Sequence, residues 1–299
     1  MRNKHLITPL LLLFVVISGC ELYLDDGYEE RYSVQSYLIA NEHLPEVRLT
    51  KTLPIEENFD QQSVAVTDAS VEIRLLNPDS SIARRFHYLH SNLGRYLPED
   101  SLHTFVKAGK PYQLYVTLPD GKKLKATTFV PGDFTALKKP KDRYEYQDSD
   151  NVAFLCSPSS YPNRQAYYLF TAQAGQPHGE NLTPYYRDLV KNKGAWINSY
   201  FINNSEISSR EKYQTDAEGN VELGIPWSVF AFFGPNKIIV NAIDDNIYDY
   251  LRFHNELTDG TTLNNGEIQS ARYNIEGGMG IFGSMARVSS EVQILKAGS

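Results

Sequence analysis

Residues 111–129 read PYQLYVTLPDGKKLKATTF, and this stretch decides the fold class. Leu114 and Val116 stand two positions apart in it, which is the period of a strand with one buried face. Asp120 and Gly121 come next, and a second alternating run follows them. Because Asp-Gly between two alternating runs is the strongest short-range signal of a β-hairpin, the sequence predicts two antiparallel strands here.

The same alternation recurs along the first half of the chain. Apolar residues stand two apart in residues 33–40, 46–52 and 70–76, and segments rich in Asn, Pro, Asp, Ser and Gly separate the runs. Short strands punctuated by turns are typical of an immunoglobulin- or fibronectin-like β-sandwich of about seven strands. We therefore expect such a sandwich over residues 31–132.

The second half of the chain predicts another β-rich domain. Residues 133–143 contain a lysine-rich run that we expect to be a solvated linker, and residues 144–299 then form the second domain. Its strand-like runs are VAFLCS, AYYLFTAQA, NVELGI and KIIVNAI, at residues 152–157, 166–174, 220–225 and 237–243. Residues 175–218 include a long polar stretch with only weak periodicity.

One helix is indicated in this domain, in the sequence DDNIYDYLRFHNEL. Asp244 or Asp245 is a suitable N-cap. Apolar positions follow with helical spacing at Ile247, Tyr250, Leu251, His254 and Leu257. The fold class expected for the whole chain is therefore mainly β, with a sandwich first and a β-rich domain containing about one helix after it.

The composition agrees with a folded β protein and excludes one class of partner. Hydrophobic residues make up 41% of the 299 residues and charged residues 22%, and the 20 Tyr and 14 Phe favour strands. The net charge is −7, and the one dense basic run lies at residues 137–143. Because nucleic-acid binding needs clustered Lys and Arg, we expect no nucleic-acid partner.

The N-terminal residues have the pattern of a lipoprotein signal peptide. A basic start precedes an apolar run over residues 6–17, which is too short to span a bilayer as a mature helix. The sequence ISGC then resembles a bacterial lipobox, and the alternative is an ordinary secretory signal that happens to contain a cysteine. We expect residues 1–19 to be removed, Cys20 to carry acyl chains such as palmitate, and residues 20–30 to be an acidic tether.

The glycines of NIEGGMGIFGSMA, residues 274–286, suggest a cofactor that their context excludes. Gly278, Gly280 and Gly283 have the G-x-G-x-x-G spacing of a dinucleotide-binding loop. Such a loop needs a following helix and a second parallel strand, yet the 16 residues after Gly283 keep strand spacing. We therefore expect a glycine-rich turn into a final strand, and no cofactor.

Signals for a metal site or for catalysis are weak. His87 and His90 stand three apart, so on a strand they point to opposite faces and do not share an ion. Residues 148–152 lack the Gly and Glu of a calcium loop, and Cys156, in an apolar run, is expected to be a buried and inert thiol. No metalloprotease, serine-hydrolase or P-loop motif occurs, so we expect neither a metal nor enzyme activity.

Several segments together resemble one known family. In order along the chain they are ISGC, DASVEI, VKAGKPYQLYVTLPDGKKLKATTFVP, NAIDDNIYDYLRF and YNIEGGMGIFGSMA. Their order and spacing resemble the Bacteroidota outer-membrane lipoproteins grouped as domain of unknown function 4249, from Cys20 to Leu295. Residues 175–218 have no match. The resemblance implies an outer-membrane lipoprotein found with TonB-dependent receptors, and it supplies no catalytic residues.

Tyrosines supply the candidate contacts to a ligand or a partner. Tyr161, Tyr185 and Tyr186 stand among prolines and polar residues, and a tyrosine ring offers an apolar face and a hydroxyl to a sugar, a peptide or a protein. We expect Tyr185 and Tyr186 to lie in a loop beside a proline. For Tyr167 and Tyr168 a structural role is favoured, with one ring on each face of a strand.

These observations lead to the expectation of a ligand-capture or accessory lipoprotein of a TonB-dependent transporter, binding a glycan or a peptide. The first alternative is a structural or adhesive surface protein whose sandwich serves as a spacer, and the second is a hydrolase. We expect the protein to be lipid-anchored in the outer membrane. The sequence leaves open the identity of the ligand, the face of the membrane and the oligomeric state.

Overall fold

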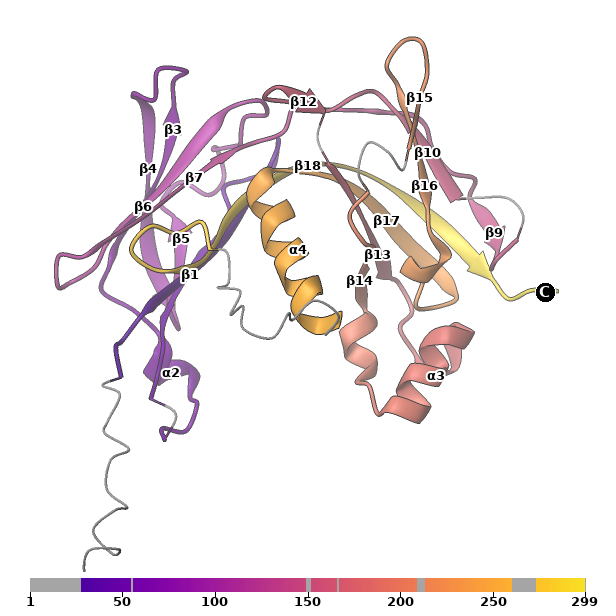
Figure 1. Ribbon diagram of the computed structural model, residues 1–299, viewed down its shortest axis with the longest axis horizontal. Helices are drawn as coiled ribbons and strands as arrows, with labels where there is room; N and C mark the ends of the chain where they lie inside the picture. Colours follow the sequence, from indigo (N-terminus) through magenta and orange to yellow (C-terminus); the bar gives the residue numbers. More distant parts are fainter. Residues whose placement is uncertain are drawn as a thin grey trace, which may run out of the picture.

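The computed structural model describes residues 28–54, 56–148, 152–165, 167–208, 213–259 and 273–298. The protein is mainly β, with its large sheets in a sandwich-like arrangement, as the alternation predicted. Figure 1 shows an arch with one lobe from the first half of the chain, a second lobe from the rest, and a long strand between them. Within the described residues, no helix is long and apolar enough to cross a bilayer.

The long strand is β18 (Met279–Leu295), and it joins the two lobes. Its first part pairs in parallel with β1 (Tyr32–Ile39), as far as Ile39 opposite Met285. Its remaining part pairs antiparallel with β17 (Gly234–Ile243). The last strand of the described residues therefore lies beside the first in one sheet.

From β1 the N-terminal lobe continues through the neighbouring strands of one curled sheet. In sheet order these are β2 (Val47–Lys51), β5 (Arg95–Pro98), β4 (Ile82–Asn92), β3 (Ser70–Leu76), β6 (Pro111–Thr117) and β7 (Lys123–Phe129). The short helix α2 (Gln61–Val64) lies between β2 and β3 in the chain. The sheet curls until β7 meets the approach to β18, where Lys125 bridges to Glu276.

The predicted hairpin is confirmed as β6 and β7. These strands pair antiparallel from Pro111 opposite Phe129 to Thr117 opposite Lys123, and Gly121 in the turn has a φ of +84°. Glycine adopts this left-handed conformation without the steric cost that a Cβ would add, so the turn closes without strain. Alternate residues of β6 are buried, as their spacing predicted.

The C-terminal lobe packs a second sheet against the continuation of the first. β14 (Ile202–Asn204) and β13 (Tyr167–Ala174) extend the large sheet beyond β17, and β9 (Arg143–Glu145) pairs with the end of β18. The second sheet has four strands, in the order β15 (Gln214–Thr215), β16 (Val221–Ile225), β10 (Val152–Cys156) and β8 (Ala136–Lys138). A separate two-stranded sheet consists of β11 (Ser160–Tyr161) and β12 (Arg164–Gln165). The four predicted strand-like runs are confirmed as β10, β13, β16 and β17.

The segment expected as a linker, residues 133–143, is partly built into these sheets. Residues 136–138 form β8, which pairs with β10, and Arg143 begins β9. Most of its side chains are exposed. The segment is therefore solvated, as expected, while sheet pairing fixes part of its backbone.

The predicted helix is confirmed as α4 (Asp245–Asp259). Asp244 caps it by accepting a hydrogen bond from the backbone N–H of Ile247 at 2.8 Å, so one of the two candidate caps is identified. Ile247 is buried against β18 and β17, which fixes the apolar face of the first turn. The side chains of His254 and Leu257 lie outside the described part of the helix.

A second α-helix of the C-terminal lobe, α3 (Pro184–Lys193), was not predicted. The expectation that Tyr185 and Tyr186 lie in a loop is therefore wrong. Proline is tolerated in the first turn of a helix, where its missing N–H has no intrahelical partner to lose, and Gly194 ends α3 with a φ of +65°. Short 3-10 turns flank this region: η1 (Gly179–Asn181), η2 (Ile197–Tyr200) and η4 (Trp227–Val229).

One hydrophobic core extends through both lobes. Its fully buried side chains include Tyr112 in the first lobe, Phe154 in the second and Phe282 of β18. Cys156 belongs to this core, and burial raises the pKa of its thiol to about 12. The predicted burial of this thiol is confirmed, and a raised pKa disfavours the thiolate, which is the reactive form.

Close packing explains the glycines around the start of β18. Gly280 has a φ of +102°, and a Cβ there would collide with the carbonyl of Val34 in β1. At Gly283 a Cβ would lie 2.5 Å from a side-chain carbon of Ile247 in α4. β18 continues as a strand through and beyond both glycines, which confirms the predicted turn into a final strand.

Candidate functional site

Of the three tyrosines predicted as ligand or partner contacts, Tyr185 presents the most exposed ring. It lies in the first turn of α3 and is 58% exposed. Tyr186 is buried, and Tyr161 is half-buried in β11. The fold therefore does not bring the three rings together on one surface.

Tyr186 holds α3 against the C-terminal lobe. Its hydroxyl donates to the carbonyl of Ser228 at 2.6 Å and accepts from the side-chain amide of Asn203 at 2.6 Å. Its ring lies edge-on to Tyr200 with centroids 4.7 Å apart, and burial raises the pKa of its hydroxyl. These contacts position the helix and leave little of the ring for a ligand.

Tyr167 and Tyr168 take the structural role that the sequence favoured. Tyr168 is fully buried in the main core and lies edge-on to Phe134, with centroids 5.9 Å apart. Tyr167 stacks on Tyr248 of α4 at a centroid distance of 4.2 Å. The two rings thus lie on opposite faces of β13.

Exposed apolar side chains gather in residues 183–204, and sequence reasoning identified Tyr185 but missed Trp196 and Ile202. Trp196, between α3 and η2, is 80% exposed, and Ile202 on β14 is 59% exposed. Large exposed apolar groups on neighbouring elements are typical of a contact surface. The available signal was Trp196 itself, one of 2 tryptophans, standing in a polar stretch without periodicity.

Tyr161 lies at the junction of the two lobes. Its ring is edge-on to Phe129 of β7, with centroids 5.6 Å apart, and its hydroxyl accepts a hydrogen bond from the backbone N–H of Asp245 at 3.2 Å. Tyr161 therefore connects the hairpin of the N-terminal lobe to the first turn of α4.

A buried carboxyl, Asp244, occupies the same junction. Thr128 of β7 hydrogen-bonds its Oδ2, and the hydroxyl of Ser284 in β18 lies 3.4 Å from the same oxygen. The Thr128 and Ser284 hydroxyl oxygens are 2.6 Å apart, and Ser284 donates to the carbonyl of Phe129 at 3.0 Å. Burial raises the pKa of Asp244 to about 7.

A neutral Asp244 would give every contact of this network one hydrogen, in keeping with its raised pKa. The contacts run from Asp244 to Thr128, from Thr128 to Ser284 and from Ser284 to the carbonyl of Phe129. Each contact needs one hydrogen, and the two hydroxyls supply one each. A protonated carboxyl supplies the third and leaves its Oδ1 to cap α4. Asp244 thus joins β7, β18 and α4.

A cavity of about 220 Å³ opens on the second sheet of the C-terminal lobe. Its floor is formed by Ala153 and Leu155 of β10. Lys138 and Glu222 lie on either side of Leu155, each opposite it in the sheet register. The remaining lining residues are Lys139, Pro140, Lys141, Tyr144 and Phe154. We call this cavity the lysine pocket.

The lysine pocket is basic within an acidic protein. It has three lysines and one glutamate in its lining, whereas the whole chain has a net charge of −7. The backbone N–H of Lys141 donates to the hydroxyl of Tyr144 at 2.9 Å, which ties the lysine-bearing segment to the lobe. Ammonium groups bind carboxylate, sulfate and phosphate, so the pocket is suited to a small anion.

Metal ligands are not gathered within the described residues, where no group of three His, Cys, Asp or Glu side chains could hold an ion. His87 lies opposite Glu72 in the sheet, and His90 packs edge-on to Tyr96 with centroids 5.4 Å apart. The calcium-like segment at residues 148–152 lies mostly outside the described residues.

The fold and its surface define a mainly β protein with sandwich-like sheets, a basic pocket and an exposed aromatic segment. The sequence profile described as "Domain of unknown function (DUF4249)" matches residues 20–291. The chain therefore belongs to this family. No curated protein matches the chain.

Solved structures offer distant likenesses. The native conformation of Escherichia coli alpha-2-macroglobulin aligns at 13% identity and a TM-score of 0.25, covering 91% of this chain and 14% of that one. A tetra-tandem repeat in the extending region of a large adhesion protein aligns at 12% identity and a TM-score of 0.23, with 89% and 49% covered. The Sidekick-1 immunoglobulin domains 1–5 align at 10% identity and a TM-score of 0.18, with 91% and 41% covered. The chain spans less than half the length of each.

Proposed function

We propose that this protein is a lipid-anchored capture protein of the outer membrane, which binds a small anionic ligand beside a TonB-dependent transporter. The lysine pocket is the observation that carries the ligand class. The lipobox at Cys20 and the family resemblance support the location and the partner.

The anchor is supported by two features of Cys20. It ends the sequence ISGC, and the family match begins at the same residue. Each buried CH₂ contributes about 0.8 kcal/mol and one acyl chain holds only marginally, so a diacylglyceryl group with an N-acyl chain gives durable attachment. Cys20→Ala should move the protein from the membrane fraction to the soluble fraction, and continued membrane association would refute the anchor.

The volume and charge of the lysine pocket narrow the class of ligand. About 220 Å³ is smaller than a drug-sized site, so the pocket suits a single sugar ring or one amino-acid residue. The ammonium groups of Lys138 and Lys139 favour an acidic member of either class, such as a uronic acid or a peptide carboxylate. Leu155 on the floor adds an apolar contact for the body of the ligand.

Calorimetric titration of the full-length protein with glucuronate, and with glucose as the uncharged counterpart, tests this ligand class. We expect glucuronate to bind, more weakly as salt is added, and glucose not to bind. Replacement of Lys138 and Lys139 by Ala should abolish binding, whereas the same change at Lys191 and Lys193 of α3 should preserve it. Equal binding of both sugars, or binding indifferent to Lys138 and Lys139, would refute the proposal.

We propose a transporter as the partner because capture of a ligand beside a transport channel would favour its uptake. Holding a ligand near a channel raises its local concentration, and a second contact multiplies a weak affinity through effective concentration. Affinity purification of the tagged, lipidated protein from gently solubilised outer membranes should recover a TonB-dependent barrel. A protein recovered without a partner would favour the structural or adhesive role instead.

A further inference from the structure

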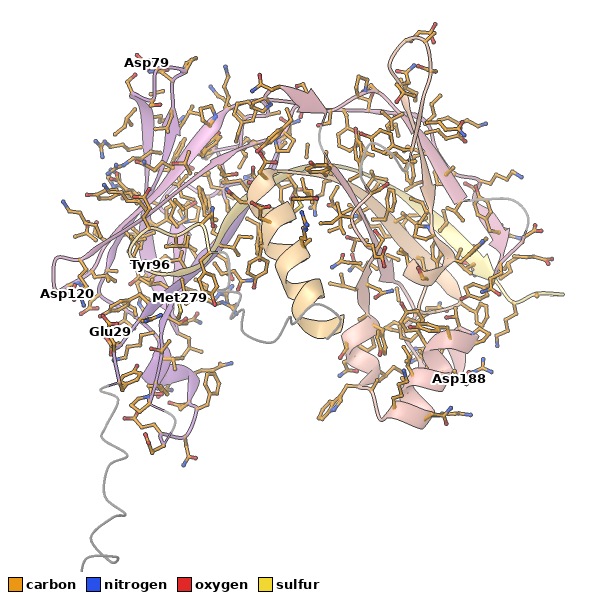
Figure 2. All side chains as sticks on the ribbon, in the orientation of Figure 1. Glu29, Asp79, Tyr96, Asp120, Asp188 and Met279 are labelled. Carbon is orange, nitrogen blue, oxygen red and sulfur yellow. The ribbon has the colours of Figure 1, made fainter. Side chains whose placement is uncertain are left out.

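The arch has two ends that point the same way. In Figure 1, α2 lies at the lower end of the N-terminal lobe, and α3 with η2 lies at the lower end of the C-terminal lobe. Figure 2 labels Glu29 and Asp188 toward these two ends and Asp79 at the opposite side of the molecule. The described part of α4 descends between the lobes and ends above the lower ends of α2 and α3. A flat surface laid against this side would therefore touch both ends.

Exposed apolar side chains mark both ends. Trp196 is 80% exposed and Phe59 is 76% exposed, the two highest values for large hydrophobic side chains among the described residues. Phe59 directly precedes Asp60, the N-cap of α2, and Trp196 stands two residues after Gly194, which ends α3. Tyr185, 58% exposed, adds a ring on the first turn of α3.

The chain enters the fold near α2. Tyr28 donates to the backbone carbonyl of Thr52, and the N–H of Arg31 donates to the Thr52 hydroxyl at 3.0 Å, so this part of the chain is fastened to the segment that leads to Phe59. Cys20 stands eight positions before Tyr28. Because a fully extended chain spans at most about 3.6 Å per residue, a lipid on Cys20 lies within about 29 Å of Tyr28.

We infer that both ends of the arch rest on the lipid surface, with Phe59 and Trp196 at the level of the headgroups. The inference rests on the lipid anchor of the proposed function. Tryptophan favours the boundary between membrane and water because its ring is apolar and its N–H is polar. Lys191 and Lys193 in the last turn of α3 attract lipid phosphate, whereas Glu57 makes the α2 end acidic, so that end is held by its ring and by the anchor.

This orientation keeps the lysine pocket open to solvent. The pocket floor belongs to β10, which Figure 1 places in the upper part of the C-terminal lobe, away from α3. A protein standing on α2 and α3 would therefore hold the pocket above the membrane, where a soluble anion can reach it.

The 2 tryptophans of the chain make the test direct. Lipidated protein with Trp227→Phe, in which Trp196 is the single tryptophan, is bound to phosphatidylethanolamine–phosphatidylglycerol vesicles whose acyl chains are brominated. Bromine quenches tryptophan at short range, so we expect a loss of emission. The matched Trp196→Phe protein should keep its emission, because Trp227 packs against Tyr146 and Phe230 at centroid distances of 5.5 and 5.7 Å.

Two further single-tryptophan proteins, made with both native tryptophans changed to Phe, test the α2 end. Phe59→Trp should be quenched as Trp196 is. Ile82→Trp, three residues after Asp79 at the opposite side of the molecule, should not be quenched. Quenching at only one of positions 59 and 196 would show that a single end touches the lipid, and it would overturn the inference that both ends do.

Flotation of the vesicles separates this inference from the proposed function. Protein that floats while Trp196 stays unquenched overturns the inference and leaves the anchor intact. Protein that does not float overturns both. A photoreactive group at position 196 should crosslink to lipid in native outer membranes, and crosslinking to a barrel protein would assign the α3 end to a protein partner and overturn the lipid contact.

Discussion

Replacement of Asp244 by asparagine should remove a pH dependence from the stability of the fold. The Asn side chain has the shape of the neutral acid: its oxygen can accept from the N–H of Ile247, and its amide can donate to the hydroxyl of Thr128. Asn is also as good a helix N-cap as Asp. Asp244→Asn therefore preserves the junction between the lobes and removes its ionisable proton.

The magnitude follows from the raised pKa of Asp244, which is about 7 in the folded protein against an ordinary value of 3.8. Between these values the folded protein keeps a proton that the unfolded chain has lost. The free energy of unfolding therefore falls as pH rises, by about 1.4 kcal/mol per pH unit. From pH 3.8 to pH 7 the titration of Asp244 lowers the free energy of unfolding by about 4 kcal/mol. Above the folded pKa the contribution of Asp244 no longer changes with pH.

Urea unfolding of both proteins, followed by circular dichroism at about pH 4 and about pH 8, measures the difference between their free energies of unfolding. We expect the two proteins to agree within about 1 kcal/mol at the lower pH, because the capping bond is kept. At the higher pH the variant should be more stable by about 4 kcal/mol. Both proteins share every other titratable group, so the difference between their free energies of unfolding at one pH reports Asp244 alone.

Asp79→Asn is the control for this experiment. Asp79 is an exposed carboxylate whose pKa is lowered by hydrogen bonds from Ser81, so it is ionised in both folded and unfolded protein over most of this pH range. Its effect on stability should be nearly constant with pH. A pH-independent difference for Asp244→Asn, or a variant that is less stable at the higher pH, would refute the neutral carboxyl at the junction.

Three other predictions test the packing. The buried hydroxyl of Tyr88 has no hydrogen-bond partner among the described residues, whereas that of Tyr96 donates to the carbonyl of Val66 at 3.0 Å. Tyr88→Phe should thus be neutral or stabilising in urea unfolding and Tyr96→Phe should cost about 1–3 kcal/mol, and equal losses would contradict this difference. Gly280→Ala should destabilise the fold by about 1–3 kcal/mol or more, because residue 280 has a positive φ and a Cβ there would collide with the Val34 carbonyl of β1. Unchanged thermal stability would mean that β18 pairs differently. The thiol of Cys156 should resist a thiol reagent until denaturant is added, because burial raises its pKa to about 12; rapid labelling of the folded protein would show that the core opens readily.

Some of the candidate site was within reach of the sequence. Thr183-Pro184 before apolar residues at helical spacing, with Gly194 after them, is a recognisable start and end for α3, because proline is as typical of the first turn of a helix as of a loop. The isolated Trp196 was also visible. The burial of Tyr186 beside the exposed Tyr185 was not, because neighbouring residues of one helix point in different directions and their surroundings belong to other elements.

The sequence by itself determined the features that local periodicity and local turn chemistry encode. These are the β6–β7 hairpin, the strands β1, β2 and β3 of the first lobe and β10, β13, β16 and β17 of the second, the capped start of α4, the final strand after the glycines and the burial of Cys156. Each depends on residues a few positions apart, whose backbone preferences and apolar spacing act before any distant contact forms. These features can be predicted from a single sequence because the residues that determine each of them lie within one short segment.

The tertiary structure alone decided which distant segments meet. β1 pairs with β18 across nearly the whole chain, Lys138 and Glu222 face each other across β10, and Asp244 meets Thr128 and Ser284 from two other strands. The lysine pocket and the raised pKa of Asp244 result from these contacts, since the charge of a site and the pKa of a side chain depend on what surrounds it after folding. The reason is physical: such pairings are chosen by the free energy of the complete packed core, to which no short segment contributes enough to decide them.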